Sequence, residues 1–540
     1  MNRSHERVRL WGGPWLLEAQ DDSAPTPLQW QPEKIQWQAE QVDVPEGKHL
    51  HWVVLETGSN QAFVFASNRR RANVGASRLI KMACTTWVDD AVGERTAASV
   101  TVVVRASGKT ILLVADKDTG KAVVRAVTKR ALKDAPGLDI WGVVQEVGCP
   151  EECCHATDEC RLKDSLKEAH ATLRQVRMSR PHPAQRAART PFTEPCRLTD
   201  MAATTTVSFG SGAEERKMPV SAQLDACLRA GRETRKGDAA EWPGVHQELD
   251  QDLGSTWVAV LHADGNGVGE LIRNLDAAPD KYLPTLKSLS SGIEAVTLAA
   301  VGEAARLVQK EACSKVHREE EEFCKRGFEE PTCRWWLPLV IGGDDVTVLL
   351  RGDLALGFTE QLLDKFRWAA KSHVWPESVN GVSLSMSAGL AFVKPHHPFN
   401  QAYDLAEELC NSAKDLSRHP GVAAIDAHVL YDSVAQPLTR LRRVSKDPGS
   451  IPGGLSTTWE AAHDFKQLKE LIGKFTESSA KKGGDNLSSR RLHAIRSALI
   501  LGGASLADAR EAITHDEDSW KTDWIDALSL ADVARSAGWA

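Results

Sequence analysis

The sequence predicts an α+β fold built from two similar units of strands and helices, and three observations lead to this prediction. Two segments, "SVTVVVRASGKTILLVADKD" and "WWLPLVIGGDDVTVLL", each carry two apolar runs around a short polar turn, which is typical of a β-hairpin. A strand-like run precedes each hairpin, "HWVVLETGSN" in one case and "TWVAVLHADGNG" in the other, with a helical pattern in between. A helical segment and a further strand-like run follow. Each unit therefore has the order strand, helix, hairpin, helix, strand of a ferredoxin-like palm.

The chain is too long for one hydrophobic core, because 540 residues normally form three or four domains. Changes in composition along it predict five parts. In chain order they are a lead-in over 1–48, a first palm domain over 49–148, a cysteine-containing insert and linker over 149–250, a second palm domain over 251–435, and a C-terminal helical domain over 436–540.

Within the first unit, "HWVVLETGSNQAFVFASN" predicts two β-rich runs around a Gly-Ser-Asn turn, and "GASRLIKMACTTWVDDAV" has helical spacing. A helix near 118–134 and the strand "LDIWGVVQEV" complete this unit. In the second unit we expect helices over about 287–312 and about 354–372. The strand "VSLSMSAGLAFV" and the amphipathic helix "NQAYDLAEELCNSAKDL" follow them.

The composition excludes several classes of protein. Hydrophobic residues make up 42% and charged residues 26%, as in ordinary globular proteins, and the net charge of −7 is not that of a polycation. Any contact with nucleic acid must then come from a local patch or a partner. No apolar run reaches the roughly 20 residues of a membrane span, and the first residues lack the apolar core of a signal peptide. We therefore expect a cytoplasmic protein without membrane contact.

Three aspartates lie at the two predicted turns of the second unit. Asp264 follows the first strand in "LHADGNG", and Asp344 and Asp345 form the hairpin tip in "GGDD". In a palm the end of the first strand lies beside the central hairpin turn, so we expect Asp264 close to Asp344. Neighbouring carboxylates repel unless a cation joins them. They suit a pair of hard divalent cations such as Mg²⁺ (or Mn²⁺), which stabilise the attacking and leaving oxygens in nucleotidyl transfer.

Glycines surround these acids and favour the same interpretation. Gly265, Gly267, Gly342 and Gly343 remove side chains where a triphosphate must approach the backbone. The alternative is an ordinary turn, since Gly and Asp favour turns for their own reasons. For the tetrapeptide "GGDD" alone that alternative is the better one. The combination of "DGN" after one strand and "GGDD" between two others, within one unit, argues against it.

These motifs resemble a known family, the large polymerase/cyclase subunit of type III CRISPR–Cas effector complexes. The second unit carries "VAVLHADGNGVGEL", "LVIGGDDVTVLL", "SMSAGLAF" and "LAEELCNSAKDL". The stretch "SNRRRANVGASRLI" is similar to that family's inactive first palm, and "EPCRLTDMAAT" to its cysteine-containing segment between the palms. The resemblance covers roughly residues 50–150, 190–210 and 250–435.

The resemblance implies an ATP-dependent synthase of cyclic oligoadenylate, a second messenger in CRISPR antiviral defence. It implies that Asp264 and Asp344 are catalytic metal ligands, assisted by Asp345. Ser387 would contact a base and Lys414 the phosphates; the plainer alternatives are an inward-facing strand serine and a surface lysine. Implied partners are other effector subunits, with guide RNA and target RNA reached through the complex. The full set of implied nucleotide-binding residues is Gly265, Asn266, Gly342, Gly343, Ser387 and Lys414, with Gly75 and Ser77 of the first palm.

The sequence departs from the family in two respects. Many members begin with a nuclease domain that carries a His-Asp metal motif, whereas about 48 residues precede the first palm here and contain no such pair. We therefore expect no DNase activity, and we interpret His463-Asp464 as incidental. Asn266 stands where some relatives carry another acid, which leaves the number of metal ions open.

A cluster of cysteines opens the predicted insert. "GCPEECCHATDEC" holds Cys149, Cys153 and Cys160, and Cys196 follows at a distance. These four are candidate ligands of a structural Zn²⁺, although the spacing is not the paired C-x-x-C form. Reduced thiols on an insert are the equal alternative.

Two other functions remain open from the sequence. One is a different nucleotide cyclase, such as a diguanylate cyclase, whose palm also carries a Gly-Gly-acid turn; the double palm argues against it. The other is a scaffold subunit that binds nucleotide but has little activity. Incubation with ATP and Mg²⁺ and mass spectrometry of the products would separate a synthase from a scaffold.

Overall fold

The computed structural model describes most of the chain between residues 49 and 431 and a few residues outside that range. The described residues are 44–45, 49–93, 99–148, 158–179, 192–199, 201–209, 216–234, 255–275, 281–316, 335–379, 381, 383–416, 421–431, 437–438, 459–460, 472, 530–531 and 533. The expected α+β class is confirmed, since helices and sheets share each unit.

The first unit contains one antiparallel sheet of four strands in the order β2-β3-β1-β4. Its helix α4 begins at an N-cap, because the Asp116 carboxylate accepts hydrogen bonds from the backbone N–H groups of Asp118 and Thr119. The elements are β1 (His51–Gly58), α1 (Asn60–Val64), α2 (Arg70–Cys84), α3 (Thr86–Val92), β2 (Val100–Ala106), β3 (Lys109–Val114), α4 (Lys117–Asp134) and β4 (Asp139–Glu146).

The second unit contains a larger sheet with the strand order β12-β11-β10-β7-β9-β8. Strand β7 lies between β9 and β10 and is antiparallel to both, while β11 is parallel to β10. The elements are β7 (Val258–Gly265), α8 (Val268–Arg273), α9 (Tyr282–Val316), β8 (Trp336–Gly342), β9 (Asp345–Arg351), α10 (Gly352–Ser372), β10 (Met386–Val393), α11 (Phe399–Leu416), β11 (Ala424–Val429) and β12 (Trp459–Glu460).

The two sheets share one arrangement of four strands, since β8-β9-β7-β10 repeats the order β2-β3-β1-β4. They also share an irregularity in the pairing of the hairpin strands. The register of the hairpin shifts between Val102 and Val104 in the first unit and between Pro338 and Val340 in the second. Both shifts lie the same number of residues before the end of the first hairpin strand. Because bulges are kept as specific features of related strands, the shared position supports the repeat that the sequence predicts.

Helices cover both faces of the first sheet. Helices α2 and α4 bury one face, which includes Val53 and Leu55 of β1. The opposite face is buried under α5 (Asp158–Ser179) and part of α9. Helix α5 is fixed there by Trp52, whose Nε1 donates to the carbonyl oxygen of Leu162 and the hydroxyl of Ser165, both at 3.1 Å. Thus α5, which lies in the range predicted as insert and linker, is part of the core of the first unit.

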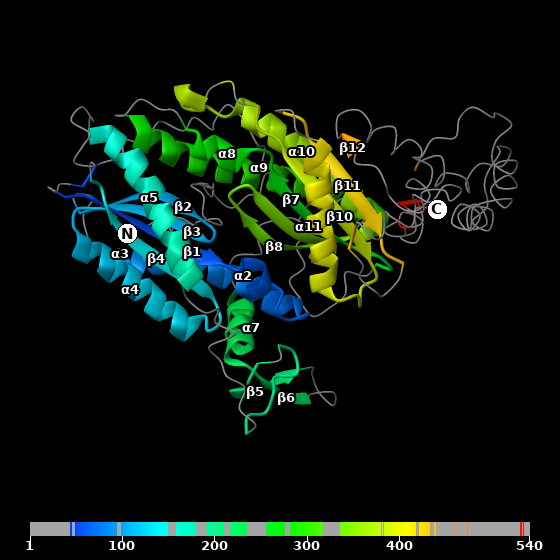
Figure 1. Cartoon of the computed structure of the whole chain (residues 1–540). Coiled ribbons are helices and arrows are strands. Elements are labelled where there is room, and N and C mark those ends of the chain that lie inside the picture. Colours follow the sequence, from blue (N-terminus) through cyan, green and yellow to red (C-terminus); the bar gives the residue numbers. More distant parts are fainter. Residues whose placement is uncertain are drawn as a thin grey trace, which may run out of the picture.

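The second sheet is covered in the same way. Helices α9 and α10 bury the face that includes Leu261, and α11 lies over the face that includes Val260. Helix α11 follows the fourth shared strand, as α5 does in the first unit. The two units lie side by side (Figure 1), and α9 packs on both β8 and β2. The ring of Phe65, just after α1, contacts the ring of Tyr403 on α11 with centroids 4.1 Å apart.

A small hairpin and a helix connect the units. Strands β5 (Thr205–Phe209) and β6 (Arg216–Val220) pair with each other, and α7 (Ala222–Thr234) packs against α2. Figure 1 shows α7 directed away from α2, with the hairpin at its far end. The part of the predicted insert around this hairpin is therefore attached to the first unit through α7.

Two sequence predictions of secondary structure differ from the structure. The second β-rich run of the first unit forms α1 and a loop instead, because Ser59, with φ of 51°, turns the chain out of the sheet and β3 and β4 already pair with β1. Strand β11 was not expected. The predicted C-terminal helical domain lies outside the described residues except for a few positions. Among the described helices, none has both the length and the apolar character needed to cross a bilayer.

A candidate active site between the two units

The fold brings the three aspartates of the second unit to one edge of its sheet. Asp264 lies at the end of β7, and the hairpin of β8 and β9 turns at Asp344 beside it. The β7–β9 register pairs Ala263 with Val346, so that continuing it by one residue sets Asp264 opposite Asp345. Asp264 therefore meets Asp344 as the sequence predicts, and Asp345 lies next to them at the same edge.

Gly265 allows the close approach of the turn to β7. A Cβ atom at Gly265 would lie 2.8 Å from both Cβ and Oδ2 of Asp344, closer than real Cβ contacts. The absence of a side chain at Gly265 therefore makes room for the Asp344 carboxylate next to that of Asp264. The role expected for this glycine was an approach of phosphate, whereas its contact in this structure is with an acidic side chain.

The grouping of acids raises pKa values, as expected for like charges. The pKa of Asp344 is raised to about 6 by burial, by the charge of Asp264 and by a hydrogen bond between the two carboxyl groups. The pKa of Asp345 is also raised, by burial and by the charges of Asp264 and Asp344. The Asp345 side chain is 43% exposed, but its Oδ1 atom is buried and has no hydrogen-bond partner among the described residues.

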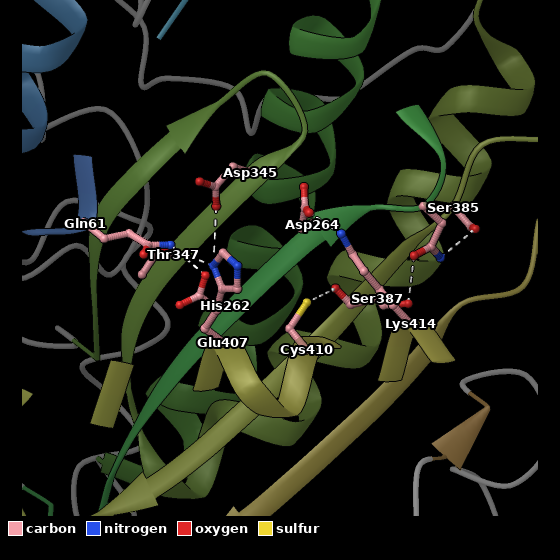
Figure 2. Close-up of polar contacts among 11 residues, drawn as sticks. Gln61, His262, Asp264, Asp345, Thr347, Ser385, Ser387, Glu407, Cys410 and Lys414 are labelled. Atoms are coloured by element: carbon pink, nitrogen blue, oxygen red, sulfur yellow. Dashed lines mark hydrogen bonds and ion pairs between the residues drawn. The ribbon is translucent and has the colours of Figure 1, made fainter. Parts of the chain in front are cut away.

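Lys414 supplies one positive charge to this group. It lies in the last turn of α11 and forms an ion pair with Oδ2 of Asp264 (Figure 2). Burial alone would lower the pKa of Lys414, but the ion pair with Asp264 raises it overall. The lysine is therefore charged and reaches the acidic site, which fits the contact with phosphates that the resemblance implies.

The carboxylates of the site meet the requirements of a divalent cation that is also held by its substrate. Within the described residues, no three His, Cys, Asp or Glu side chains converge as they would around a preformed metal site. Asp264 and Asp344 are nevertheless adjacent, and Oδ1 of Asp345 is buried without a partner among the described residues. Mg²⁺ is commonly bound by only one or two carboxylates and completed by water and substrate phosphates. The residues thus fit such an ion.

A cavity of about 340 Å³ separates the two units at this point. The turn residues Gly342 to Asp345 line it from the second unit, and Ser77 and Lys109 line it from the first. Gly343 has a φ of 61°, and a Cβ atom placed on it would have no other atom within 4 Å, so its conformation and its open side both suit the rim of a binding site. Gly342 contacts the first unit, since its Cβ would lie 2.5 Å from Cβ of Ser107.

Two of the predicted nucleotide-binding residues hydrogen-bond to each other within the second unit. Asn266 uses its whole amide within the protein: Nδ2 donates to the Ser385 hydroxyl and the Val422 carbonyl, both at 3.0 Å, and Oδ1 accepts from Ser387 at 2.9 Å. Ser387 is fully buried. Ser387 thus orients Asn266, which ties the end of β7 to β10 and the chain before β11, and the contact of Ser387 with a base stays a prediction.

Gly75 lies at a close contact between two helices, and its predicted place beside the second ATP stays a prediction. A Cβ atom there would lie 1.8 Å from the carbonyl oxygen of Cys227, and one at Gly231 would lie 2.2 Å from the carbonyl oxygen of Arg71. The two glycines allow α2 and α7 to cross in close contact. Gly75 is absent from the residues that line the cavity, while Ser77, two positions on, is among them.

The four candidate zinc ligands differ in how far the structure describes them. Cys149 and Cys153 lie outside the described residues, and Cys160 lies in α5 at a position whose side chain is not described. Cys196 is buried as a free thiol. Burial raises its pKa, but hydrogen bonds from the Thr199 hydroxyl and nearby backbone N–H groups lower it overall. Zinc binding stays a prediction.

Sequence reasoning missed two polar residues beside the acids. His262 and Thr347 are paired across β7 and β9, and each lies two residues from an aspartate of the site. Side chains two residues apart on a strand share a face, so the alternation of "HAD" and "DVT" could have indicated both. Figure 2 shows His262 next to Asp345 and Thr347.

The first unit carries a different set of charges at the equivalent edge. Glu56 and Lys109 are paired in the β1–β3 register at the positions of Asp264 and Asp345. The Glu56 carboxylate lies 3.6 Å from Nζ of Lys109 and 3.5 Å from Nη1 of Arg177 in the last turn of α5. The single carboxylate is therefore balanced by two side-chain cations, which leaves no reason for a metal ion.

Comparison with known proteins gives one family and one group of structures. Residues 257–421 match the model of the family described as Cas10/Cmr2, second palm domain. The fold is similar to that of a chain in the crystal structure of a Csm1–Csm4 cassette in complex with pppApApA, with a TM-score of 0.51, 12% identity, and coverage of 92% of this chain and 71% of that chain. The complexes with pppApA and with one ATP each give a TM-score of 0.50, 13% identity, and coverage of 91% and 70%. No curated protein matches the sequence.

Proposed function

We propose that this chain, a Cas10-like large subunit by the family of its second palm domain, makes cyclic oligoadenylates from ATP in a type III CRISPR effector complex. In this proposal the two units are ferredoxin-like palms, the first inactive and the second catalytic. The observation that carries it is the contact of Asp264 with Asp344, an aspartate that lines a cavity shared by both units. In this proposal the two nucleotides face each other from the two units.

The proposed reaction joins two ATP molecules. A ribose hydroxyl of one ATP attacks the α-phosphate of the other, the new phosphodiester bond forms, and pyrophosphate leaves with the electrons of the broken bond. Asp264, Asp344 and Asp345 would hold Mg²⁺ (or Mn²⁺), which when bound supplies the charge that makes the hydroxyl more acidic and stabilises the leaving group. No general base is assigned among the side chains of the site.

The residues of this chain have distinct tasks in the proposal. Gly343 leaves the rim open for the triphosphate. The Lys414 ammonium group, which pairs with Asp264 in the nucleotide-free protein, would contact both Asp264 and the phosphates. Ser77 is the residue of the first unit that would face the second nucleotide. Asn266 and Ser387 keep the end of β7 fixed while the nucleotides bind.

Similar structures support a role within a complex. They are described as Csm1–Csm4 cassettes in complex with pppApApA, pppApA or one ATP. We propose that this chain likewise works with other subunits of a type III effector complex, and meets guide and target RNA through them.

One observation favours the alternative of a nucleotide-binding scaffold. The described residues do not include three side chains that converge on one metal position, and Lys414 is engaged with Asp264. A preformed cation site would have been the stronger sign of activity.

Mass spectrometry of reaction products separates the two proposals. The purified protein, alone and with its partner subunits and target RNA, is incubated with ATP and Mn²⁺ or Mg²⁺. The synthase proposal expects linear or cyclic adenylates from the wild type and none from Asp264→Asn or Asp344→Asn. Binding of ATP without any adenylate product, in the presence of partners and target RNA, would support the scaffold.

A further inference from the structure

The two units differ in the strand pair that lies directly behind the charged edge. In the second unit, His262 on β7 is opposite Thr347 on β9. In the first unit the same register position is occupied by Val54 and Ile111. The same fold therefore accepts an apolar pair here, and packing alone does not require a histidine and a threonine.

The histidine of this pair also lies beside the carboxylate of Asp345. Nδ1 of His262 lies 3.1 Å from Oγ1 of Thr347 and 3.5 Å from Oδ1 of Asp345, as Figure 2 shows. This Oδ1 is the buried oxygen that has no hydrogen-bond partner among the described residues. His262 and Thr347 are both buried, at 8% and 1% exposure. Burying polar groups is unfavourable unless they interact, and here Thr347 is the hydrogen-bond partner of the same His262 nitrogen that lies nearest the Asp345 carboxylate.

The histidine ring is held in one orientation from the other side. Its ring packs edge-on against that of Tyr403 on α11, with centroids 5.5 Å apart. The Tyr403 hydroxyl accepts a hydrogen bond of 3.0 Å from Nε2 of Gln61, a residue of the first unit. The same amide donates to Glu407 at 2.7 Å. The ring therefore lies between a fixed aromatic side chain and the strand that carries Asp345.

We propose that His262 and Thr347 are positioning residues that fix the Asp345 carboxylate in the orientation that binds a divalent cation. Thr347 holds Nδ1 of His262 in place, and the His262 ring beside Oδ1 restrains rotation of the Asp345 carboxylate. Residues that orient metal ligands in this way typically change metal affinity 10- to 100-fold when they are replaced. The inference rests on the proposed function, since it assigns a support to the cation site of that proposal.

Paired substitutions isolate the contact from the packing. Thr347→Val keeps the shape of the side chain and removes the hydroxyl, whereas Thr347→Ser keeps the hydroxyl. His262→Asn retains an amide group near the position of Nδ1, whereas His262→Gln carries it to the region of Nε2. Mn²⁺ binding by the nucleotide-free full chain is measured by calorimetry, together with the thermal midpoint of the metal-free protein. We expect Thr347→Val and His262→Gln to weaken Mn²⁺ binding about tenfold, and Thr347→Ser and His262→Asn to stay within about threefold of wild type.

His373→Leu is the matched control for loss of a buried histidine. His373 is 7% exposed, and neither of its ring nitrogens has a hydrogen-bond partner among the described residues. This variant is expected to bind Mn²⁺ as the wild type does. Wild-type affinity in folded Thr347→Val and His262→Gln would overturn the positioning role alone. If the wild type binds no Mn²⁺ either alone or with a non-hydrolysable ATP analogue, the cation site of the proposed function fails and the positioning role fails with it.

Discussion

Asp344 makes the folding stability of the second unit depend on pH in the direction opposite to that of most carboxylates. Its pKa of about 6 lies above the ordinary aspartate value of 3.8, so the folded protein binds this proton more tightly than the unfolded chain. The stability that the proton provides is present below about pH 4 and is lost as the pH rises through about 6. At neutral pH the ionised Asp344 therefore destabilises the metal-free protein.

Replacement of the Asp344 carboxylate tests the direction of this pH dependence. Asp344→Asn should raise the free energy of unfolding of the metal-free protein by about 1 kcal/mol at neutral pH, because it removes one of several adjacent charges. The gain should shrink as the pH falls toward 4. Urea unfolding in EDTA at several pH values measures it for both proteins. A difference that does not change with pH would contradict the pKa given for Asp344.

Lys414 has the opposite effect on the same charges. Lys414→Met keeps much of the aliphatic stem and removes the cation that pairs with Asp264. The metal-free protein should lose about 1 kcal/mol of stability, since a partly exposed ion pair contributes no more than this. Mn²⁺ should restore most of the loss by replacing the missing charge. Lys414→Arg is the control and should stay near wild type. Equal stability of Lys414→Met and wild type in EDTA would exclude this role.

The sequence predicted the acidic residues of the site well, because Asp264, Asp344 and Asp345 follow from the turns of two strands. It predicted the polar residues around them poorly. Asn266 and Ser387 hydrogen-bond to each other across neighbouring strands, and neither that pairing nor their burial follows from a motif. Residues that hold a site together carry no local signal that separates them from residues that touch the ligand.

At the scale of elements, the contact of α2 with α7 depends on two glycines. Gly75→Ala places a Cβ atom 1.8 Å from the carbonyl oxygen of Cys227, so the helices must separate. We expect a loss of about 2 kcal/mol or more, as for other overpacked helix contacts. Gly302→Ala in α9 is the control, because no atom lies within 4 Å of its Cβ position. Alanine there should be neutral or stabilise by up to about 1 kcal/mol.

Thermal unfolding and ATP binding of the two variants together distinguish two roles for Gly75. A packing role lowers the thermal midpoint of Gly75→Ala and leaves the ATP affinity of the folded protein unchanged. The role first implied by the family resemblance would reduce ATP affinity at an unchanged midpoint. That second outcome would contradict the helix crossing described above.

Most long elements could be predicted from periodicity, and the failures have local causes. Helix α4 and strand β4 follow from their patterns, as do α10 and α11. The segment of α1 resembles a strand in composition, but both edges of β1 are already paired, one with β3 and the other with β4. Helix α5 lies in the range predicted as insert and linker, and its place on the first sheet depends on the contact of Trp52 with residues more than a hundred positions away.

At the scale of the whole molecule, the two hairpin turns contact each other at the wall of the cavity. The Cβ position of Gly342 lies 2.5 Å from Cβ of Ser107, so the turn of the second unit rests on the turn of the first. The two bulged hairpins thus set the distance between the units. We infer that this contact controls the width of the cavity in which the two nucleotides are proposed to react.

A suppressor pair tests the contact. Gly342→Ala should force the two turns apart, lowering stability by about 1–3 kcal/mol and reducing adenylate synthesis. Because the clash is between two Cβ atoms, adding Ser107→Gly to Gly342→Ala removes one of them and should restore both properties. Gly343→Ala is the control: its Cβ position is open but its φ is 61°, so alanine there is strained by about 1 kcal/mol for backbone reasons alone. Ser107→Gly should not rescue that variant. Rescue of both alanine variants, or of neither, would show that the turns do not set the spacing of the units.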